Sequence, residues 1–275
     1  MATTSAPPPP LTRTDQREVR IYQHSMLFYW WPVWVVAYLM ALWTWWDGHR
    51  MAIMPKDATV HRSAEGKSYT LDIPHPENAV TLNQAASGEQ GFRLHVSENP
   101  RLGAIFVAVL LLVIFITTVP LRGLWSVIVI VTLILLSIIL ALANLWDDIF
   151  RAFAALHIYI NLAGYLFTAT GLLALWLVAV FFFDRQTYMV FTPGQLKVCL
   201  EIGGGEQAYD TMGMTIQKLR DDLFRHWILG LGSGDLVVRT SGAQAHEFQM
   251  HNVLNVGTKL REIEDMQRER PTVQG

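Results

Sequence analysis

Four long apolar stretches without a charged side chain constrain this chain more than any other feature of its sequence. They cover residues 26–46, 103–119, 124–145 and 158–183, and none of them contains Asp, Glu, Lys, Arg or His. At a rise of about 1.5 Å per residue, helices of this length reach, or nearly reach, across a hydrocarbon core of roughly 30 Å. Of the 275 residues 52% are hydrophobic and 16% charged, which is too apolar for an ordinary soluble protein of this size. We therefore expect an integral membrane protein whose first partner is the lipid bilayer.

The spans have the composition of an anchor. Ionisable residues inside a membrane are costly and usually mark ion paths or substrate sites, so their absence weakens a transporter hypothesis. The fourth span carries Gly164, Thr168 and Gly171 on one face, where a second helix could approach closely. This helix-packing face favours a homo-oligomer, although glycines that are merely tolerated in lipid would give the same pattern.

Positive charges near the spans predict the orientation. Arg13, Arg17 and Arg20 precede the first span, Arg122 lies in the short loop between the second and third, and Asp147 with Asp148 follows the third. By the positive-inside rule both termini face the cytoplasm, and a bacterial cytoplasmic (inner) membrane is the expected location. Residues 1–25, which open with MATTSAPPPP, should form a flexible cytoplasmic tail, because their charges and prolines do not fit a cleavable signal peptide.

Two segments should lie on the outer side. Residues 47–102 form an extracytoplasmic, β-rich segment, in which 68–74 and 91–97 alternate as strands do. Its histidines lack the spacing of a metal motif, so we expect no metal site there. Residues 146–157 should form an amphipathic interfacial helix, with its aromatic side chains on one face and Asp147, Asp148 and Arg151 on the other.

The pattern changes to short strands after Phe183. Strand-like segments occur at 187–192, 195–202, 210–219, 235–242 and 246–251, and they precede an amphipathic helix over 252–270 with Asn252 as its N-cap. Cys199, the only cysteine, excludes an internal disulfide and is most simply a small apolar strand residue. Residues 184–270 should thus form a cytoplasmic domain, followed by a short tail over 271–275.

This C-terminal third resembles the bacterial pleckstrin-homology-like domain of membrane proteins. Tyr188 with FTPGQL (191–196), RHWILGLGSGDLVVRTSG (225–242) and the helix that opens NVLNVGTKLREI (252–263) match the pattern of that family. The resemblance implies a β-barrel capped by a helix and docked under a helical anchor. The expected fold class is therefore α + β: four transmembrane helices, a C-terminal pleckstrin-homology-like barrel and a small β-rich extracytoplasmic insertion.

The candidate interface is an apolar turn inside this domain, residues 223–232, which we call the hinge. Its large apolar residues are Leu223, Phe224, Trp227, Ile228 and Leu231. They could plug the open end of the barrel, which we favour, or contact the membrane or a partner. The turn glycines Gly230, Gly232 and Gly234 are best explained by backbone geometry, since no phosphate-binding G-x-x-x-x-G-K-[ST] motif follows.

The expected function is that of a membrane-anchored interaction or scaffold protein with an unknown protein partner. The alternative is a membrane-interface enzyme or transporter component with an unidentified substrate. We favour the first, because no nucleophile motif or metal pattern is present, and we expect no enzymatic activity, no catalytic residues and no cofactor. A formal charge of −2 gives no reason to expect nucleic acid as a partner.

Overall fold

The computed structural model describes residues 18–63, 68–75, 94–119, 121, 123–199, 205–219, 222–241 and 245–268. The chain divides into two compact units. The sheet unit consists of residues 1–28, 121–126 and 177–275, and the helical unit consists of residues 29–120 and 127–176. The fold is therefore mixed helix and sheet, as predicted, with the two kinds of structure largely separated.

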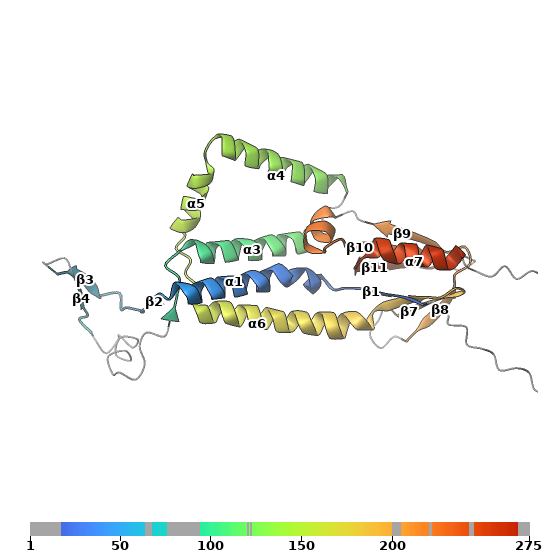
Figure 1. The fold of residues 1–275 in the computed structure, drawn as a ribbon, viewed down its shortest axis with the longest axis horizontal. Helices are drawn as coiled ribbons and strands as arrows, with labels where there is room; N and C mark the ends of the chain where they lie inside the picture. The colour runs from blue at the N-terminus through green and yellow to red at the C-terminus, as the bar shows by residue number, and fades with distance from the viewer. Residues whose placement is uncertain are drawn as a thin grey trace, which may run out of the picture. The chain divides into compact units, whose positions relative to one another are not determined.

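The sheet unit contains two antiparallel sheets and one long helix (Figure 1). A four-stranded sheet has the order β1-β6-β7-β8, with β1 at Val19–Tyr22, β6 at Tyr188–Phe191, β7 at Gln195–Cys199 and β8 at Gln207–Asp210. A three-stranded sheet has the order β11-β10-β9, with β9 at Thr215–Leu219, β10 at Gly234–Arg239 and β11 at Glu247–Val253. The sheets are not closed, so the predicted barrel is not shown.

Strand β1 differs from the flexible tail predicted over residues 1–25. It pairs antiparallel with β6, so that Val19 lies opposite Phe191 and Tyr22 opposite Tyr188. Val19 and Ile21 point into the core while Arg20 and Tyr22 are exposed, which is the period-two alternation of a strand with one buried face. A segment before the first apolar helix thus completes a sheet built from residues after the last one. The rest of that predicted tail, over 1–17, and the tail predicted over 271–275 lie outside the described residues.

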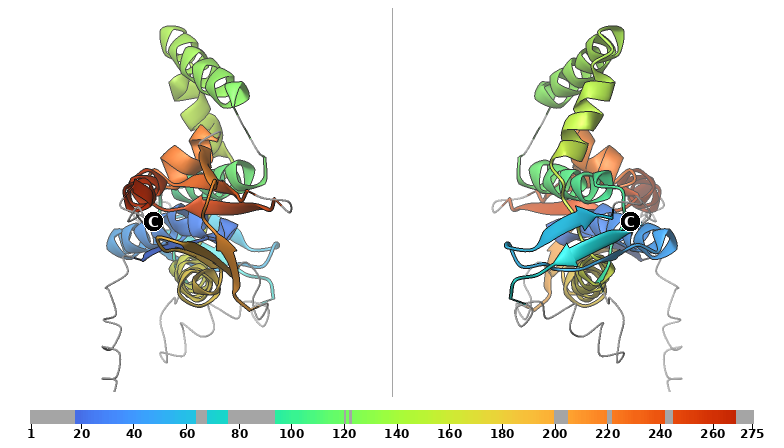
Figure 2. Two further views of the ribbon diagram at one scale, coloured as in Figure 1. Left: turned by 90° about the vertical axis from the view of Figure 1, so that its right-hand side faces the viewer. Right: turned by 90° about the vertical axis from the view of Figure 1, so that its left-hand side faces the viewer.

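Helix α7, at Val256–Arg268, covers the core of the sheet unit (Figure 2). Its buried residues Val256, Ile263 and Met266 recur at helical spacing, and the helix contacts β1, β9 and β10. The core also contains Val19, Ile21, Met189, Phe191, Leu196, Val198, Met214, Leu236, Val238, Met250 and Val253.

The start of α7 differs from the prediction. Asn252, expected as the N-cap, belongs to β11 and has φ of 57°. The first turn instead forms on Asn255, whose carbonyl accepts hydrogen bonds from the N–H groups of Thr258 and Lys259.

Four helices are long and apolar enough to cross a membrane, which confirms that part of the prediction. They are Met26–Asp47, Arg101–Thr118, Leu124–Leu142 and Leu162–Gln186. The first combines the 3-10 turn η1 (Met26–Trp30) with α1 (Trp31–Asp47), and the next two are α3 and α4. The last joins α6 (Leu162–Val178) to the π-turn η3 (Ala179–Phe183) and the 3-10 turn η4 (Asp184–Gln186).

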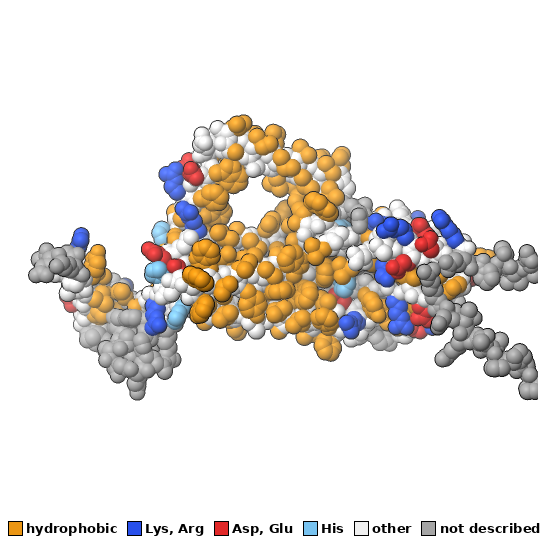
Figure 3. All heavy atoms as spheres, in the orientation of Figure 1, with side chains coloured by type: hydrophobic (Ala, Val, Ile, Leu, Met, Phe, Trp, Pro, Cys, Tyr) orange, Lys and Arg blue, Asp and Glu red, His pale blue; other side chains and the backbone are white. Residues whose placement is uncertain are grey.

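Helices α1, α3 and α6 form the core of the helical unit. Val33, Ala37 and Ala41 make a buried small-residue stripe on α1, and Phe106 of α3 contacts Tyr165 of α6 edge to face at 5.6 Å. In α4 the only buried residue is Ser126, so nearly all of this helix exposes apolar side chains. Figure 3 shows such side chains covering the visible face of the helices, as expected of surfaces that face lipid.

Helix α6 starts four residues later than predicted. Asn161 directly precedes the helix, and its side-chain oxygen accepts a hydrogen bond from Gly164 N–H at 2.6 Å. This contact satisfies one of the free donors of the first helical turn, which is the usual role of an asparagine N-cap.

The remaining elements are small. The segment between α1 and α3 contains two antiparallel strand pairs, β2 (Arg50–Met51) with β5 (Leu94–His95) and β3 (Thr59–Arg62) with β4 (Tyr69–Asp72). Part of the predicted strand at 91–97 lies outside the described residues. The predicted amphipathic helix is α5 at Trp146–Ala155, and its Phe150 and Phe153 line a cleft of about 240 Å³ together with residues of α3.

Candidate functional site

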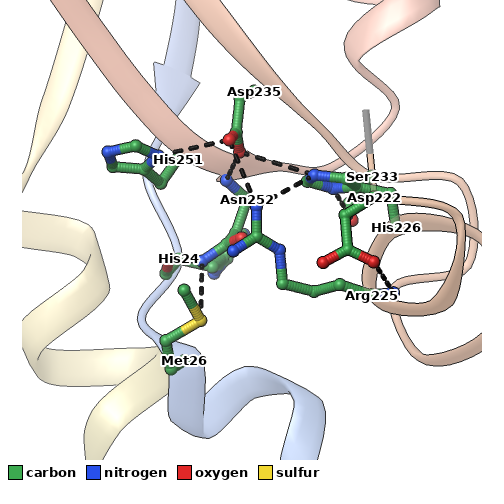
Figure 4. Close-up of polar contacts among 9 residues, drawn as sticks. All are labelled: His24, Met26, Asp222, Arg225, His226, Ser233, Asp235, His251 and Asn252. Atoms are coloured by element: carbon green, nitrogen blue, oxygen red, sulfur yellow. Dashed lines mark hydrogen bonds and ion pairs between the residues drawn. The ribbon is translucent and has the colours of Figure 1, made fainter. Parts of the chain in front are cut away.

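The most polar part of the sheet unit's interior is a cluster around Asp235, at the start of β10 (Figure 4). Its members come from separate elements: Arg225 and His226 from the π-turn η5 (Phe224–Leu229), Ser233 from the following loop, and His251 and Asn252 from β11. Asp235, Arg225 and His226 are each at most 5% exposed. Buried charges of this kind persist only when they are paired, so the contacts decide what the cluster does.

Both oxygens of Asp235 are occupied. Oδ2 lies 3.2 Å from Arg225 Nη2 and 3.3 Å from His251 Nδ1, and Oδ1 accepts a hydrogen bond of 3.0 Å from Asn252 N–H. Burial alone would raise the pKa of this carboxyl, but the hydrogen bonds from His251 and Asn252, together with the Arg225 charge, lower the pKa below its ordinary value. Asp235 is therefore a stabilised carboxylate and not a proton donor at neutral pH.

His226 connects the guanidinium to the loop. Its Nε2 lies 3.2 Å from Arg225 Nη2, and its Nδ1 lies 3.3 Å from the Ser233 hydroxyl. A ring that accepts at Nε2 and donates at Nδ1 satisfies both contacts. The Nε2 to Asp235 Oδ1 distance of 3.7 Å is too long for a hydrogen bond.

The hinge is shaped so that these polar groups point inward. Asp222 Oδ1 accepts a hydrogen bond from Arg225 N–H, and the Asp222 carbonyl accepts one from His226 N–H, which together start the π-turn. The turn closes where Gly232 N–H donates to the His226 carbonyl at 2.9 Å. Phe224, Arg225, His226 and Leu229 are buried, whereas Trp227 and Ile228 face outward.

This orientation corrects the predicted barrel plug. Trp227 is 75% exposed, Ile228 45% and Leu231 72%, so these three side chains plug nothing in the sheet unit. Phe224 is buried, and Leu223 is half-buried. The hinge thus has an inner side that carries the polar cluster and an outer side that carries solvent-exposed apolar side chains.

The three turn glycines have different roles. Gly232 has φ of 90°, which favours glycine, and Leu231 beside it also adopts a left-handed φ of 49°. Gly230 has an ordinary φ of −97°, so its backbone does not require glycine. Gly234 begins β10 next to a register shift in the pairing with β11, where the strand is buried.

A second pair of titratable groups extends the cluster toward the end of the fourth apolar helix. His24 Nδ1 lies 3.0 Å from Asp184 Oδ2, and Ser25 N–H donates to Asp184 Oδ1 at 3.0 Å. The Asn252 side chain donates to the His24 carbonyl at 2.8 Å, so the segment after β1 is tied to β11. An open cleft of about 420 Å³ borders this pair and is lined by Tyr22, His24, Val180, Phe181, Asp184 and Arg185.

The described contacts of these groups pair elements of the sheet unit with one another. Among the described residues, no group of three His, Cys, Asp or Glu side chains has the arrangement of a metal site. The Asp235 cluster joins η5, β10 and β11, and the His24 to Asp184 contact joins the N-terminal segment to the helix end. Both arrangements position backbone elements that are distant in sequence.

The predicted helix-packing residues lie in the helical unit. Gly171 is exposed, and a Cβ added there would meet no atom within 4 Å, while Thr168 is half-buried. Gly164 is half-buried, and a Cβ there would lie 3.0 Å from the Asn161 side-chain oxygen. The face that packs inside the helical unit is instead formed by Tyr165 and Ala169.

The Asp235 cluster was not predicted from the sequence. The signal was present: a carboxylate opens the apolar strand GDLVVR, and Arg225 with His226 interrupts the apolar hinge. A charge inside a core strand demands a partner, but the sequence alone does not say which of several cations supplies it.

Comparison with protein-family models, with curated proteins and with solved structures gives no match. The resemblance to the bacterial pleckstrin-homology-like family therefore stays a prediction.

Proposed function

We propose that this chain is a membrane-anchored interaction or scaffold protein that presents its sheet unit at the cytoplasmic face of a bacterial inner membrane. The pairing of β1 with β6 carries the proposal. Residues before the first candidate span and after the last share one sheet, and backbone pairing of this kind cannot form across a bilayer. If the four helices cross the membrane, an even number of crossings returns the chain to the side on which it began.

The charge distribution supports the cytoplasmic side. Arg20 lies in β1 and Arg185 at the end of the fourth candidate span, and both belong to the sheet unit. In the sequence, Arg122 follows the second span. Arginines concentrated at these span ends are typical of cytoplasmic ends.

The arrangement of the interior favours interaction over catalysis. Asp235 has both oxygens engaged by side chains and a backbone N–H of the same unit, so the cluster stabilises the domain. The surface of the unit includes exposed strand edges. Strands β8 and β9 are edge strands of their sheets, and Gln207, Ala208 and Asp210 of β8 are exposed. An open edge can accept an extended segment of a partner as an additional strand.

The predicted family is supported by the order of elements after residue 187. The resemblance implies strands that are followed by a terminal helix, and the described elements after residue 187 are six strands, β6 to β11, followed by α7. The strand supplied by residues 19–22 is an addition to that pattern.

The proposal is tested by cross-linking in cells that produce the full chain. A photoreactive amino acid at Ala208, on the β8 edge, should form covalent adducts with one partner protein, whereas the same group at Glu264, on the exposed side of α7, should not. Adduct formation should persist in a His24→Gln variant, because that residue lies away from the edge strand.

Two results would contradict the proposal. If neither position forms adducts in membranes of the native host, no protein binds this edge. If His24→Gln abolishes the biological effect of the chain while the adducts and the fold persist, the cleft beside His24 is the working site, and the membrane-interface enzyme gains support.

A further inference from the structure

The outer side of the η5 hinge carries three bare apolar side chains, Trp227, Ile228 and Leu231, which we call the apolar tip. Each of them is exposed, and Trp227 is the most exposed of the three. Exposed apolar groups of this size at one turn are costly in water and usually mark a contact surface.

The orientation of the tip is fixed from within. Arg225 is held by Asp235 at 3.2 Å and His226 by Ser233 at 3.3 Å, so the two residues before Trp227 point into the unit. The tip cannot turn inward without breaking these buried contacts. It therefore stays exposed unless something outside the sheet unit covers it.

The tip is attached to the start of a candidate membrane span. Leu223 N–H, one residue before η5, donates a hydrogen bond of 3.1 Å to the hydroxyl of Ser126. Ser126 is the third residue of α4, the span at Leu124–Leu142, and it is fully buried. Leu124 and Trp125, its neighbours in the first turn, are largely exposed, as side chains that face lipid would be.

The sheet unit also contains the end of another candidate span. Its residues 177–186 include the end of the fourth span, where Phe181, Phe182 and Phe183 are exposed. Hydrogen bonds within the sheet unit connect η5 to this helix end. Asp235 contacts Arg225 of η5 and the N–H of Asn252. The Asn252 side chain donates to the carbonyl of His24, whose ring contacts Asp184. The side of the unit that holds η5 is thus the side from which spans leave.

We propose that the apolar tip inserts into the interfacial layer of the cytoplasmic leaflet, next to the span that begins at Leu124. A tryptophan flanked by aliphatic side chains is the composition that this layer favours. The inserted hinge supplies a membrane contact besides the four spans and fixes the rotation of the sheet unit over the bilayer. The inference goes beyond the proposed function, because it concerns lipid and not a protein partner.

The test uses the full chain reconstituted into phosphatidylcholine vesicles. In a Cys199→Ser background, a single cysteine at Trp227 is labelled with the fluorophore NBD, and lipids carrying nitroxide-labelled chains serve as quenchers. The matched control is a cysteine at Met212, which is 68% exposed in the turn after β8 of the same unit. We expect blue-shifted emission at position 227 that loses most of its intensity to the lipid quencher, and red-shifted emission at position 212 that the lipid does not quench but aqueous iodide does.

Equal accessibility to iodide at both positions would overturn the proposal. So would a probe at position 227 that is protected from both quenchers, since that result shows a protein surface, such as a second copy, over the tip. A labelled Ile228→Cys variant repeats the measurement at a second position, so that misfolding at one site does not decide the outcome. Neither result depends on whether the β8 edge binds a partner, so the two proposals fail separately.

Discussion

Replacing Asp235 by asparagine tests whether the buried cluster holds the sheet unit together. Asparagine has nearly the same shape, so the change removes the charge without creating a cavity. It leaves the Arg225 guanidinium without a buried counterion, and it places a donor amide among groups that already donate, His251 Nδ1 and Asn252 N–H. The loss is therefore larger than that of one hydrogen bond.

The magnitude follows from the burial. Breaking a buried ion pair by removing one partner costs about 3 to 5 kcal/mol, and the retained amide oxygen places Asp235→Asn at about 3 kcal/mol. The control lies at the other end of the same strand, where Arg239 pairs with Glu247 at 3.0 Å and the two side chains are 59% and 54% exposed. Arg239→Gln should cost at most about 1 kcal/mol, because solvent screens an exposed pair.

Amide hydrogen exchange of the full chain in detergent measures the difference locally. A loss of about 3 kcal/mol corresponds to exchange faster by roughly a hundredfold in peptides that cover β10 and β11, since about 1.4 kcal/mol is a factor of ten. Peptides of the helical unit should exchange as in the wild type. If Asp235→Asn accelerates exchange no more than Arg239→Gln does, the cluster does not stabilise the unit.

Three further predictions concern acid, packing and assembly. The pKa of Asp235 is lowered in the folded state, so its contribution to stability is complete above the ordinary pKa of 3.8 and is lost as the pH falls through the lower folded pKa. The strands β10 and β11 should therefore lose protection from hydrogen exchange in that acid range, and Asp235→Asn should remove this pH dependence. Gly103→Ala should destabilise the helical unit by about 1 to 3 kcal/mol, because a Cβ would overlap the carbonyl oxygen of Ile158 and lie 2.8 Å from its carbonyl carbon. The control is Gly171→Ala, whose Cβ meets no atom within 4 Å. The thermal midpoint of Gly103→Ala should be lower than that of the control. Gly171→Leu should leave the fold of one copy intact but reduce the mass of a detergent-solubilised homo-oligomer in light scattering, and an unchanged mass would exclude this face as the seam.

The apolar helices were predictable because lipid imposes a simple rule on composition. A helix that crosses a membrane must be apolar along its whole length, so the runs at 26–46 and 124–145 carry the information locally. The exact ends were less predictable: α6 begins after Asn161 because that side chain caps it, and a cap depends on one contact. Five strands of the last third were also predicted from their alternation, with ends that differ by up to about five residues, but β8 at Gln207–Asp210 was not predicted.

Strand β1 and the Asp235 cluster were not predicted, for the same physical reason. VRIY is a short segment between charged residues, and its partner β6 lies about 170 positions later in the chain, as the pairing of Val19 with Phe191 shows. The contact of Arg225 with Asp235 similarly depends on a π-turn that rotates polar groups inward, where an ordinary helical pattern would have placed the apolar groups. Interactions of this kind are decided by tertiary contacts, which the local sequence does not contain.

The proposed topology depends most on one contact, the pairing of the segment before the first span with the segment after the last. Tyr22 and Tyr188 lie directly opposite each other in β1 and β6. In a Cys199→Ser background, cysteines at these two positions should form a disulfide on mild oxidation of native membranes, since paired strand residues have the spacing that the bond requires. Cysteines at Tyr22 and Ala208, which lie on strands that are not neighbours, should not. A disulfide between positions 22 and 188 alone supports the shared sheet; no disulfide there, under conditions in which each cysteine reacts with a small maleimide, contradicts it.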